Sequence, residues 1–282
     1  MGMRTRRFTV RNGLTLLADE SGPESGLPVV LLHGGGQTRG SWKNGAASLA
    51  EAGYRVVALD TRGHGESSWA PDGDYSIGAM TNDLRQVLAQ LPPRPALVGA
   101  SMGGMTALCL LGEPEPPPVR ALVLVDIVPR FNRDGANRIL EFMTANSDGF
   151  TSVEEAADAV AAYNTHRPRP KDISGLRRNL REQEGRFYWH WDPVFISSQF
   201  GDRAKLGQML EEASRRVNVP AMLVRGALSD LVGEAEVQYF RELMPHAEFA
   251  DVAGAGHMVA GDRNDAFNDA ILSFLQKTDT AG

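Results

Sequence analysis

The chain has 282 residues, of which 42% are hydrophobic and 23% charged, a composition typical of a globular protein with one large or two small domains. Its 29 basic and 35 acidic residues give a formal net charge of −6. This balance argues against a nucleic-acid-binding protein or one that binds an anionic membrane surface. The single cysteine, Cys109, excludes an internal disulfide and a cluster of thiolate metal ligands. We expect neither a metal nor a cofactor.

No apolar run approaches the roughly 20 residues that a membrane-spanning helix needs. The basic start, residues 1–13, is not followed by the apolar segment of a secretion signal. We therefore expect a soluble cytoplasmic protein with no membrane partner. The sequence does not indicate its oligomeric state.

Short apolar runs alternate with segments of helical period over the first 126 residues, a pattern that predicts parallel strands joined by crossover helices. Continuous apolar runs, such as PVVLL, indicate strands that are covered on both faces. The predicted strands are Arg7–Val10, Leu14–Asp19, Pro28–Leu32, Arg55–Leu59, Ala96–Gly99 and Arg120–Val125. The predicted helices are Trp42–Ala52, Ala79–Leu91 and Met102–Leu111.

The alternation stops after Asp126 and resumes at Ala221. The intervening segment has polar helical stretches and one dense aromatic patch, Phe187–Trp191. We therefore predict an α/β core of residues 1–128 and 218–282, interrupted by a helical cap at 129–217. The remaining predicted elements are helices Val153–Tyr163, Ala204–Arg216, Glu234–Met244 and Asp265–Gln276, and strands Ala221–Gly226 and Glu248–Val252.

The most informative segment is Gly99-Ala-Ser101-Met-Gly103-Gly104, which matches G-x-S-x-G between a predicted buried strand and a predicted helix. A tight turn at that place strains the backbone of its central residue, and the glycines leave room for the turn. The Ser101 hydroxyl would then be exposed beside a helix N-terminus, whose N–H groups favour developing negative charge. Ser101 is therefore the predicted nucleophile.

A serine hydroxyl needs a base, and a base needs a carboxylate that holds its tautomer. Of six histidines, His257 lies in a glycine-rich loop between the last predicted strand and the last helix, and it is the predicted base. His166, His190 and His246 have no comparable setting. Asp230 follows the strand Ala221–Gly226 and is the predicted acid.

Two further loops carry motifs. Leu32-His33-Gly34-Gly35-Gly36 follows the third predicted strand, and its glycines let the backbone approach a substrate carbonyl. We expect His33 to brace this loop rather than to transfer protons. The second loop, Asp60-Thr-Arg-Gly-His64-Gly-Glu-Ser67, follows the strand Arg55–Leu59.

Taken together, these motifs resemble the α/β-hydrolase fold family, in its serine-nucleophile branch, over residues 6–276. The resemblance implies a mostly parallel, eight-stranded sheet flanked by helices, with a helical cap over the site. It also implies the triad order Ser101…Asp230…His257. Some members take the acid from the earlier strand, which makes Asp126 the alternative. The implied oxyanion donors are the backbone N–H groups of Gly35 and Met102, with Gly36 as an alternative to Gly35.

Relatives that form alkyl-enzyme intermediates have aspartate as the nucleophile, so Ser101 favours acyl transfer. We expect an ester or lactone of a small to medium apolar substrate, cleaved through an acyl-enzyme. The cap and adjoining loops would supply specificity. The candidate substrate-binding residues are Gly34, Gly36, Trp42, Trp189, Trp191 and Met258.

Two alternatives remain open. C–C bond hydrolysis or perhydrolysis of the haloperoxidase type would use the same triad. The second alternative is not an enzyme but a ligand-binding protein of the same fold. The intact triad argues against it, because a binding protein would not need one. Labelling of Ser101 by a fluorophosphonate separates the enzyme from the binding protein.

Overall fold

Eight strands form one sheet in the computed structural model of the chain, which describes residues 2–163, 169, 172–199, 203–253, 256 and 265–280. The strand order is β1-β2-β4-β3-β5-β6-β9-β10, parallel from β4 to β10, with β2 antiparallel to both its neighbours. The predicted eight-stranded, mostly parallel sheet is therefore confirmed. Its strands are β1 (Arg4–Thr9), β2 (Thr15–Ser21), β3 (Pro28–Leu32), β4 (Arg55–Leu59), β5 (Ala96–Ala100), β6 (Ala121–Val125), β9 (Ala221–Gly226) and β10 (Glu248–Val252).

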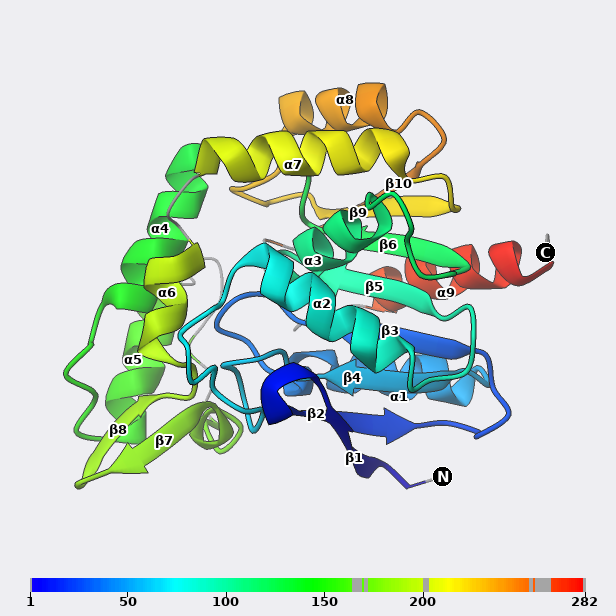
Figure 1. The fold of residues 1–282 in the computed structure, drawn as a ribbon. Helices are drawn as coiled ribbons and strands as arrows, with labels where there is room; N and C mark the ends of the chain where they lie inside the picture. The colour runs from blue at the N-terminus through cyan, green and yellow to red at the C-terminus, as the bar shows by residue number, and fades with distance from the viewer. Residues whose placement is uncertain are drawn as a thin grey trace.

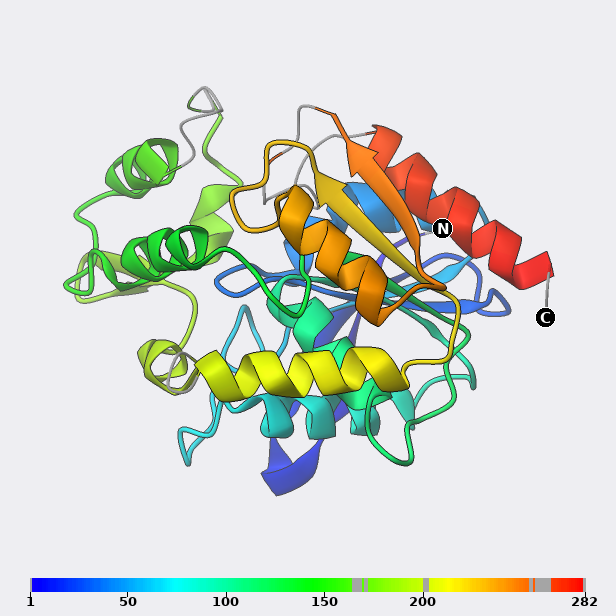
Figure 2. The same ribbon diagram turned by 90° about the horizontal axis from the view of Figure 1, so that it is seen from above.

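Helices cover both faces of this sheet (Figures 1 and 2). α1 and α9 pack on one face, while α2, α3, α7 and α8 pack on the other. The α-helices are α1 (Lys43–Glu51), α2 (Ile77–Leu88), α3 (Met102–Leu111), α4 (Arg133–Thr144), α5 (Val153–Tyr163), α6 (Pro193–Gln199), α7 (Arg203–Arg216), α8 (Glu234–Leu243) and α9 (Asp265–Thr280). Short 3-10 helices are η1 (Arg11–Gly13), η2 (Arg39–Trp42) and η3 (Leu176–Asn179). In the described part of the chain, no helix has the length and apolar character needed to cross a membrane.

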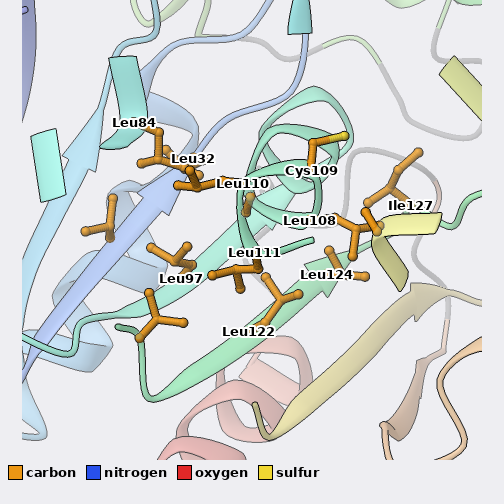
Figure 3. Close-up of a cluster of buried hydrophobic side chains, with 14 of the residues drawn as sticks. Leu32, Leu84, Leu97, Leu108, Cys109, Leu110, Leu111, Leu122, Leu124 and Ile127 are labelled. Carbon is orange, nitrogen blue, oxygen red and sulfur yellow. The ribbon is translucent and has the colours of Figure 1, made fainter. Parts of the chain in front are cut away.

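The central strands divide their side chains between two hydrophobic cores, because successive residues of a strand point to opposite faces. In β6, Leu122 and Leu124 pack toward α3, whereas Val123 and Val125 pack toward α1 and α9. Figure 3 shows the first of these cores, where side chains of β5 and β6 meet those of α3. Burial on both faces explains why these strands read as continuous apolar runs.

The inserted segment contains α4, α5 and α6, which lie together beyond one end of the sheet (Figure 1). It also contains an antiparallel hairpin of β7 (Leu180–Gln183) and β8 (Arg186–Trp189), which the sequence analysis did not predict. Glu184 and Gly185 form its two-residue turn, with φ of 50° and 76°, the backbone that short hairpins require. The following helix, α7, packs against α3 and so covers the core.

Candidate active site

Ser101 occupies a sharp turn between β5 and α3, with φ 46° and ψ −114°. Such a backbone is strained for any residue with a side chain. A Cβ atom on Gly99 would lie 2.5 Å from the Gly104 nitrogen, and one on Gly103 would lie 2.5 Å from the Leu32 carbonyl oxygen. These contacts are too close for any side chain, so the glycines of the motif allow α3 to pack tightly against β3 and β5.

Ser101 lines a cavity of about 230 Å³ that lies between the sheet and the cap. None of the described residues around this cavity carries a charge. Among the residues proposed from the sequence as substrate contacts, Gly34, Gly36, Trp189 and Trp191 line it. Trp189 and Trp191 stack with ring centroids 5.1 Å apart. Further apolar walls come from α3 and from the cap helices α4 and α5, through Met102, Met105, Ile139, Phe142, Met143 and Val160.

Trp42 does not belong to this cavity, which corrects its assignment as a substrate contact. Its side chain is buried at the start of α1 and stacks on Phe267 of α9, with ring centroids 6.2 Å apart. Trp42 follows the glycine loop in sequence, and that proximity suggested a place in the pocket wall. The packing of α1 against α9 instead directs the indole into the core.

The hydrogen bonds of the glycine loop show which of its N–H groups are already engaged. The N–H of Gly34 donates to Gln37 Oε1 at 3.1 Å, and the N–H of Gly36 donates to His64 Nε2 at 3.1 Å. In the described part of the chain, no hydrogen bond uses the N–H of Gly35 or of Met102. Because the N–H of Gly36 is engaged, the pair Gly35 and Met102 is favoured over the alternative that uses Gly36.

His33 braces this loop as expected. Its Nδ1 lies 2.8 Å from the Gly34 carbonyl oxygen, and its Nε2 accepts the Thr61 N–H at 3.1 Å. Since Nε2 accepts from a backbone donor, the proton of the neutral ring is on Nδ1 and is donated to Gly34. Complete burial lowers the pKa of His33, which keeps the ring neutral.

The D-x-R-G-H-G-x-S loop holds the second bracing imidazole, His64. Its ring is fully buried 5.1 Å from that of His33, and burial lowers its pKa well below the ordinary value. Arg62 of the same loop makes two bonds of 2.6 Å to Asp83 of α2. These contacts make the loop a support for the site.

His190 was given no role by its sequence setting, yet the structure places it in the same cluster. It follows β8 of the cap, its ring lies 5.8 Å from that of His64, and it is 2% exposed. No local motif marks it, because the hydrogen-bond partners of its ring lie more than 120 residues away in the chain. The adjacent Trp189 and Trp191, both facing the cavity, are the one sequence signal nearby.

The two candidate acids differ in their surroundings. Asp126 is fully buried at the end of β6, with φ 50°, and accepts from the Gly226 N–H at 3.2 Å and from Ser229 Oγ at 2.6 Å. The Asp230 carboxylate is 38% exposed and lies 2.7 Å from the guanidinium of Arg138 on α4. Asp230 therefore joins the loop after β9 to the cap.

The predicted base, His257, and the predicted pocket residue Met258 lie outside the described residues. Their assignments stay predictions. The strand that precedes them, β10, pairs with β9 at the edge of the sheet, on the same side of β5 as β6. Asp126 ends β6, and Asp230 lies in the loop after β9, so both follow strands between β5 and β10.

Comparisons with known proteins agree with the fold. The profile of the alpha/beta hydrolase fold family matches residues 28–263. The chain is 32% identical to the mouse sn-1-specific diacylglycerol lipase ABHD11 over 259 residues, which cover 88% of this chain and 80% of the lipase. It is 30% identical to esterase Rv0045c of Mycobacterium tuberculosis over 264 residues, covering 88% of this chain and 82% of the esterase.

Among solved structures, E-2-(acetamidomethylene)succinate hydrolase superposes with a TM-score of 0.85 at 22% identity, covering 98% of this chain and all of that one. At that identity the likeness concerns the fold. The family profile and the two sequence relatives go further: the chain belongs to the alpha/beta hydrolase fold family. Within that family it is an enzyme that hydrolyses ester bonds.

Proposed function

We propose that the chain is a serine hydrolase that cleaves a carboxylic ester or lactone of a neutral, apolar substrate through an acyl-enzyme on Ser101. His257 takes the proton from Ser101 Oγ as the oxygen attacks the substrate carbonyl carbon. The N–H groups of Gly35 and Met102 stabilise the resulting oxyanion. The alcohol then departs with a proton from His257, and water, activated by the same imidazole, releases the acid. The strained turn between β5 and α3, which exposes Ser101 to the cavity, carries this proposal.

For the triad acid, the contacts around the two carboxylates favour Asp126 over the Asp230 expected from the sequence. An acid that holds an imidazole stays ionised while buried, so it needs hydrogen-bond donors of its own. Asp126 has such donors on both oxygens, from Gly226 and Ser229. Asp230 is already engaged by Arg138 and is partly exposed. We assign Asp126 as the acid and Asp230 as an anchor of α4.

The uncharged wall of the cavity supports a neutral substrate. A buried carboxylate on the substrate would find no counter-ion among the described lining residues, and burying an unpaired charge is costly. Burial also raises the pKa of the one lining phenol, Tyr163, to about 12, so that it stays neutral. The name of the mouse relative gives diacylglycerol, itself a neutral and apolar ester, as the substrate of that protein. An ester with a similarly apolar acyl group suits this cavity.

The proposal is tested with a panel of p-nitrophenyl esters from acetate to decanoate, a set of neutral lactones, and a p-nitrophenyl ester whose acyl group ends in a carboxylate. We expect hydrolysis of neutral esters or lactones, at least tenfold weaker hydrolysis of the anionic ester, and no turnover by Ser101→Ala. A preference for the anionic ester would contradict the substrate assignment. Binding of these compounds without turnover would favour the non-catalytic alternative. Cleavage restricted to C–C bonds would favour a C–C bond hydrolase, and activity that depends on peroxide would favour a perhydrolase.

A further inference from the structure

The glycine loop is held at successive carbonyl and N–H groups by three buried imidazoles. His33 donates to the Gly34 carbonyl, and His64 accepts from the Gly36 N–H. His190 Nε2 lies 3.2 Å from the Gly36 carbonyl oxygen. Two of these histidines belong to the core, whereas His190 comes from the cap.

The backbone partners of His190 and His64 show which ring nitrogen of each carries the proton. His190 Nδ1 accepts the Gly65 N–H at 2.8 Å, so the proton of the neutral ring lies on Nε2 and is donated to the Gly36 carbonyl. His64 Nε2 accepts the Gly36 N–H, so its Nδ1 donates to the Arg62 carbonyl at 3.1 Å. The two rings thus bond the N–H and the C=O of the same glycine.

Gly36 directly follows the proposed oxyanion donor Gly35, and it has φ 72°. In a trans peptide the C=O and N–H point in opposite directions, so fixing one fixes the other. His33 orients the peptide that carries the Gly35 N–H through its carbonyl, that of Gly34. Rotation about the backbone of Gly36 would release that orientation, because the φ and ψ angles of glycine have few steric limits. The bonds from His64 and His190 oppose this rotation.

We infer that His190 is a positioning residue for the oxyanion hole, through which the cap holds the Gly35 N–H in its working direction. This inference rests on the proposed function. His190 is suited to the role because it is anchored on both sides: its own N–H donates to the Asn179 carbonyl at 3.1 Å, and the N–H of Asp192 donates to the Gly63 carbonyl at 2.9 Å. The flanking Trp189 and Trp191 line the cavity. The same short segment therefore contacts the substrate space and supports the oxyanion loop.

Burial lowers the pKa of His190 to about 3, so the ring stays neutral and able to accept from Gly65 at neutral pH. A charged ring would have donors on both nitrogens and would lose that bond. The hydrogen bond from the Gly65 N–H therefore requires the neutral form of the His190 ring.

Two substitutions separate the two bonds of this ring. The amide oxygen of asparagine in His190→Asn takes the place of Nδ1 and keeps the Gly65 contact. The amide nitrogen of glutamine in His190→Gln takes the place of Nε2 and keeps the donor to Gly36.

We expect His190→Asn to lower kcat on the best nitrophenyl ester by about tenfold to a hundredfold, with KM within twofold, because full loss of an oxyanion donor costs about 10² to 10³. We expect His190→Gln to stay within about fivefold of the parent. His246→Asn, at an exposed histidine, is the matched control.

Amide hydrogen exchange of a peptide covering residues 32–38 gives a readout that does not need activity. We expect faster exchange in His190→Asn than in His190→Gln or in the parent. Equal kcat for the two variants, whether both are impaired or both are unimpaired, would overturn the inference, as would exchange that does not differ between them. If the parent neither hydrolyses esters nor reacts at Ser101, the proposed function fails. The exchange measurement then decides alone whether His190 holds the loop.

Discussion

The hydroxyl of Ser229 lies 2.6 Å from Oδ2 of Asp126, and its orientation is set by two backbone groups. Ser229 Oγ accepts the N–H of Leu231 and the N–H of Val232, each at 3.2 Å. Its own proton is therefore directed to Asp126. With Gly226 donating to the other oxygen, the loop after β9 forms a cradle for a buried carboxylate at the end of β6.

Exchange of each acid for its amide tests which carboxylate serves the base. We expect Asp126→Asn to lower kcat by about 10³ to 10⁴, because an amide favours the wrong tautomer of the imidazole. Asp230→Asn should lower kcat by less than tenfold, since it removes only a partly exposed ion pair with Arg138. Steady-state kinetics on one nitrophenyl ester provides the comparison. The reverse ranking would restore Asp230 as the acid.

Loss of the Ser229 hydroxyl should lower both stability and activity, because this hydroxyl donates to Asp126, the proposed triad acid. Ser229→Ala removes one hydrogen-bond donor to the buried Asp126 carboxylate and the acceptor of two backbone N–H groups. We expect the free energy of unfolding to fall by about 1–3 kcal/mol and kcat to fall as well. Ser197→Ala, which removes an exposed hydroxyl bonded to the Val194 carbonyl, serves as the control in urea unfolding. Equal losses for the two variants would show that the cradle has no special importance.

The cap helix α4 should determine which acyl chains fit. Ile139 of α4 lines the cavity, so Ile139→Trp would occupy part of its volume of about 230 Å³. We expect kcat/KM for octanoate and longer esters to fall at least tenfold relative to acetate. Glu141→Trp adds the same bulk to an exposed position of α4 and should leave the chain-length profile unchanged. An unaltered profile in Ile139→Trp would place the acyl group elsewhere.

Three buried neutral histidines make the fold sensitive to acid. The pKa values of His33, His64 and His190 are lowered by burial, that of His190 to about 3, whereas an unfolded histidine titrates near 6.5. Between these values only the unfolded chain binds the protons, so the free energy of unfolding rises with pH. The His190 ring should cost about 1 kcal/mol of stability as the pH falls from 7 to 5.5, and His33 and His64 should act in the same direction.

Urea unfolding at the two pH values measures this effect, and His190→Gln isolates one ring. The variant should lose about 1 kcal/mol less than the parent over this interval. A variant with the same pH dependence as the parent would indicate that His190 is not kept neutral in the folded protein. His246→Gln, at an exposed position, is expected to match the parent.

The sequence predicted those parts of the molecule that depend on local pattern. The runs Pro28–Leu32 and Ala221–Gly226 form strands with those bounds, because burial on both faces demands continuous apolar residues. The turn at Ser101 was also predictable, since its steric demand falls on glycines that stand beside it in the motif.

Other features depend on contacts between distant segments. Trp42 was misplaced because its position follows from the packing of α1 on Phe267, and nothing near it in sequence reports that contact. The hairpin β7–β8 has its turn at Glu184 and Gly185, a pair weaker than the Asn-Gly or Asp-Gly signals typical of such turns. The choice between Asp126 and Asp230 rests on Ser229 and Arg138, whose contacts only the folded chain brings about.

Covalent modification of Ser101 provides the decisive test of its role as the nucleophile. The protein is treated with a fluorophosphonate, digested, and analysed by mass spectrometry, with Ser101→Ala as the control. The role of Ser101 as nucleophile predicts one adduct per chain, located on Ser101, and loss of ester hydrolysis in proportion to labelling. Full hydrolytic activity in a protein that carries no adduct on Ser101, or an adduct on another residue that tracks the loss of activity, would contradict it.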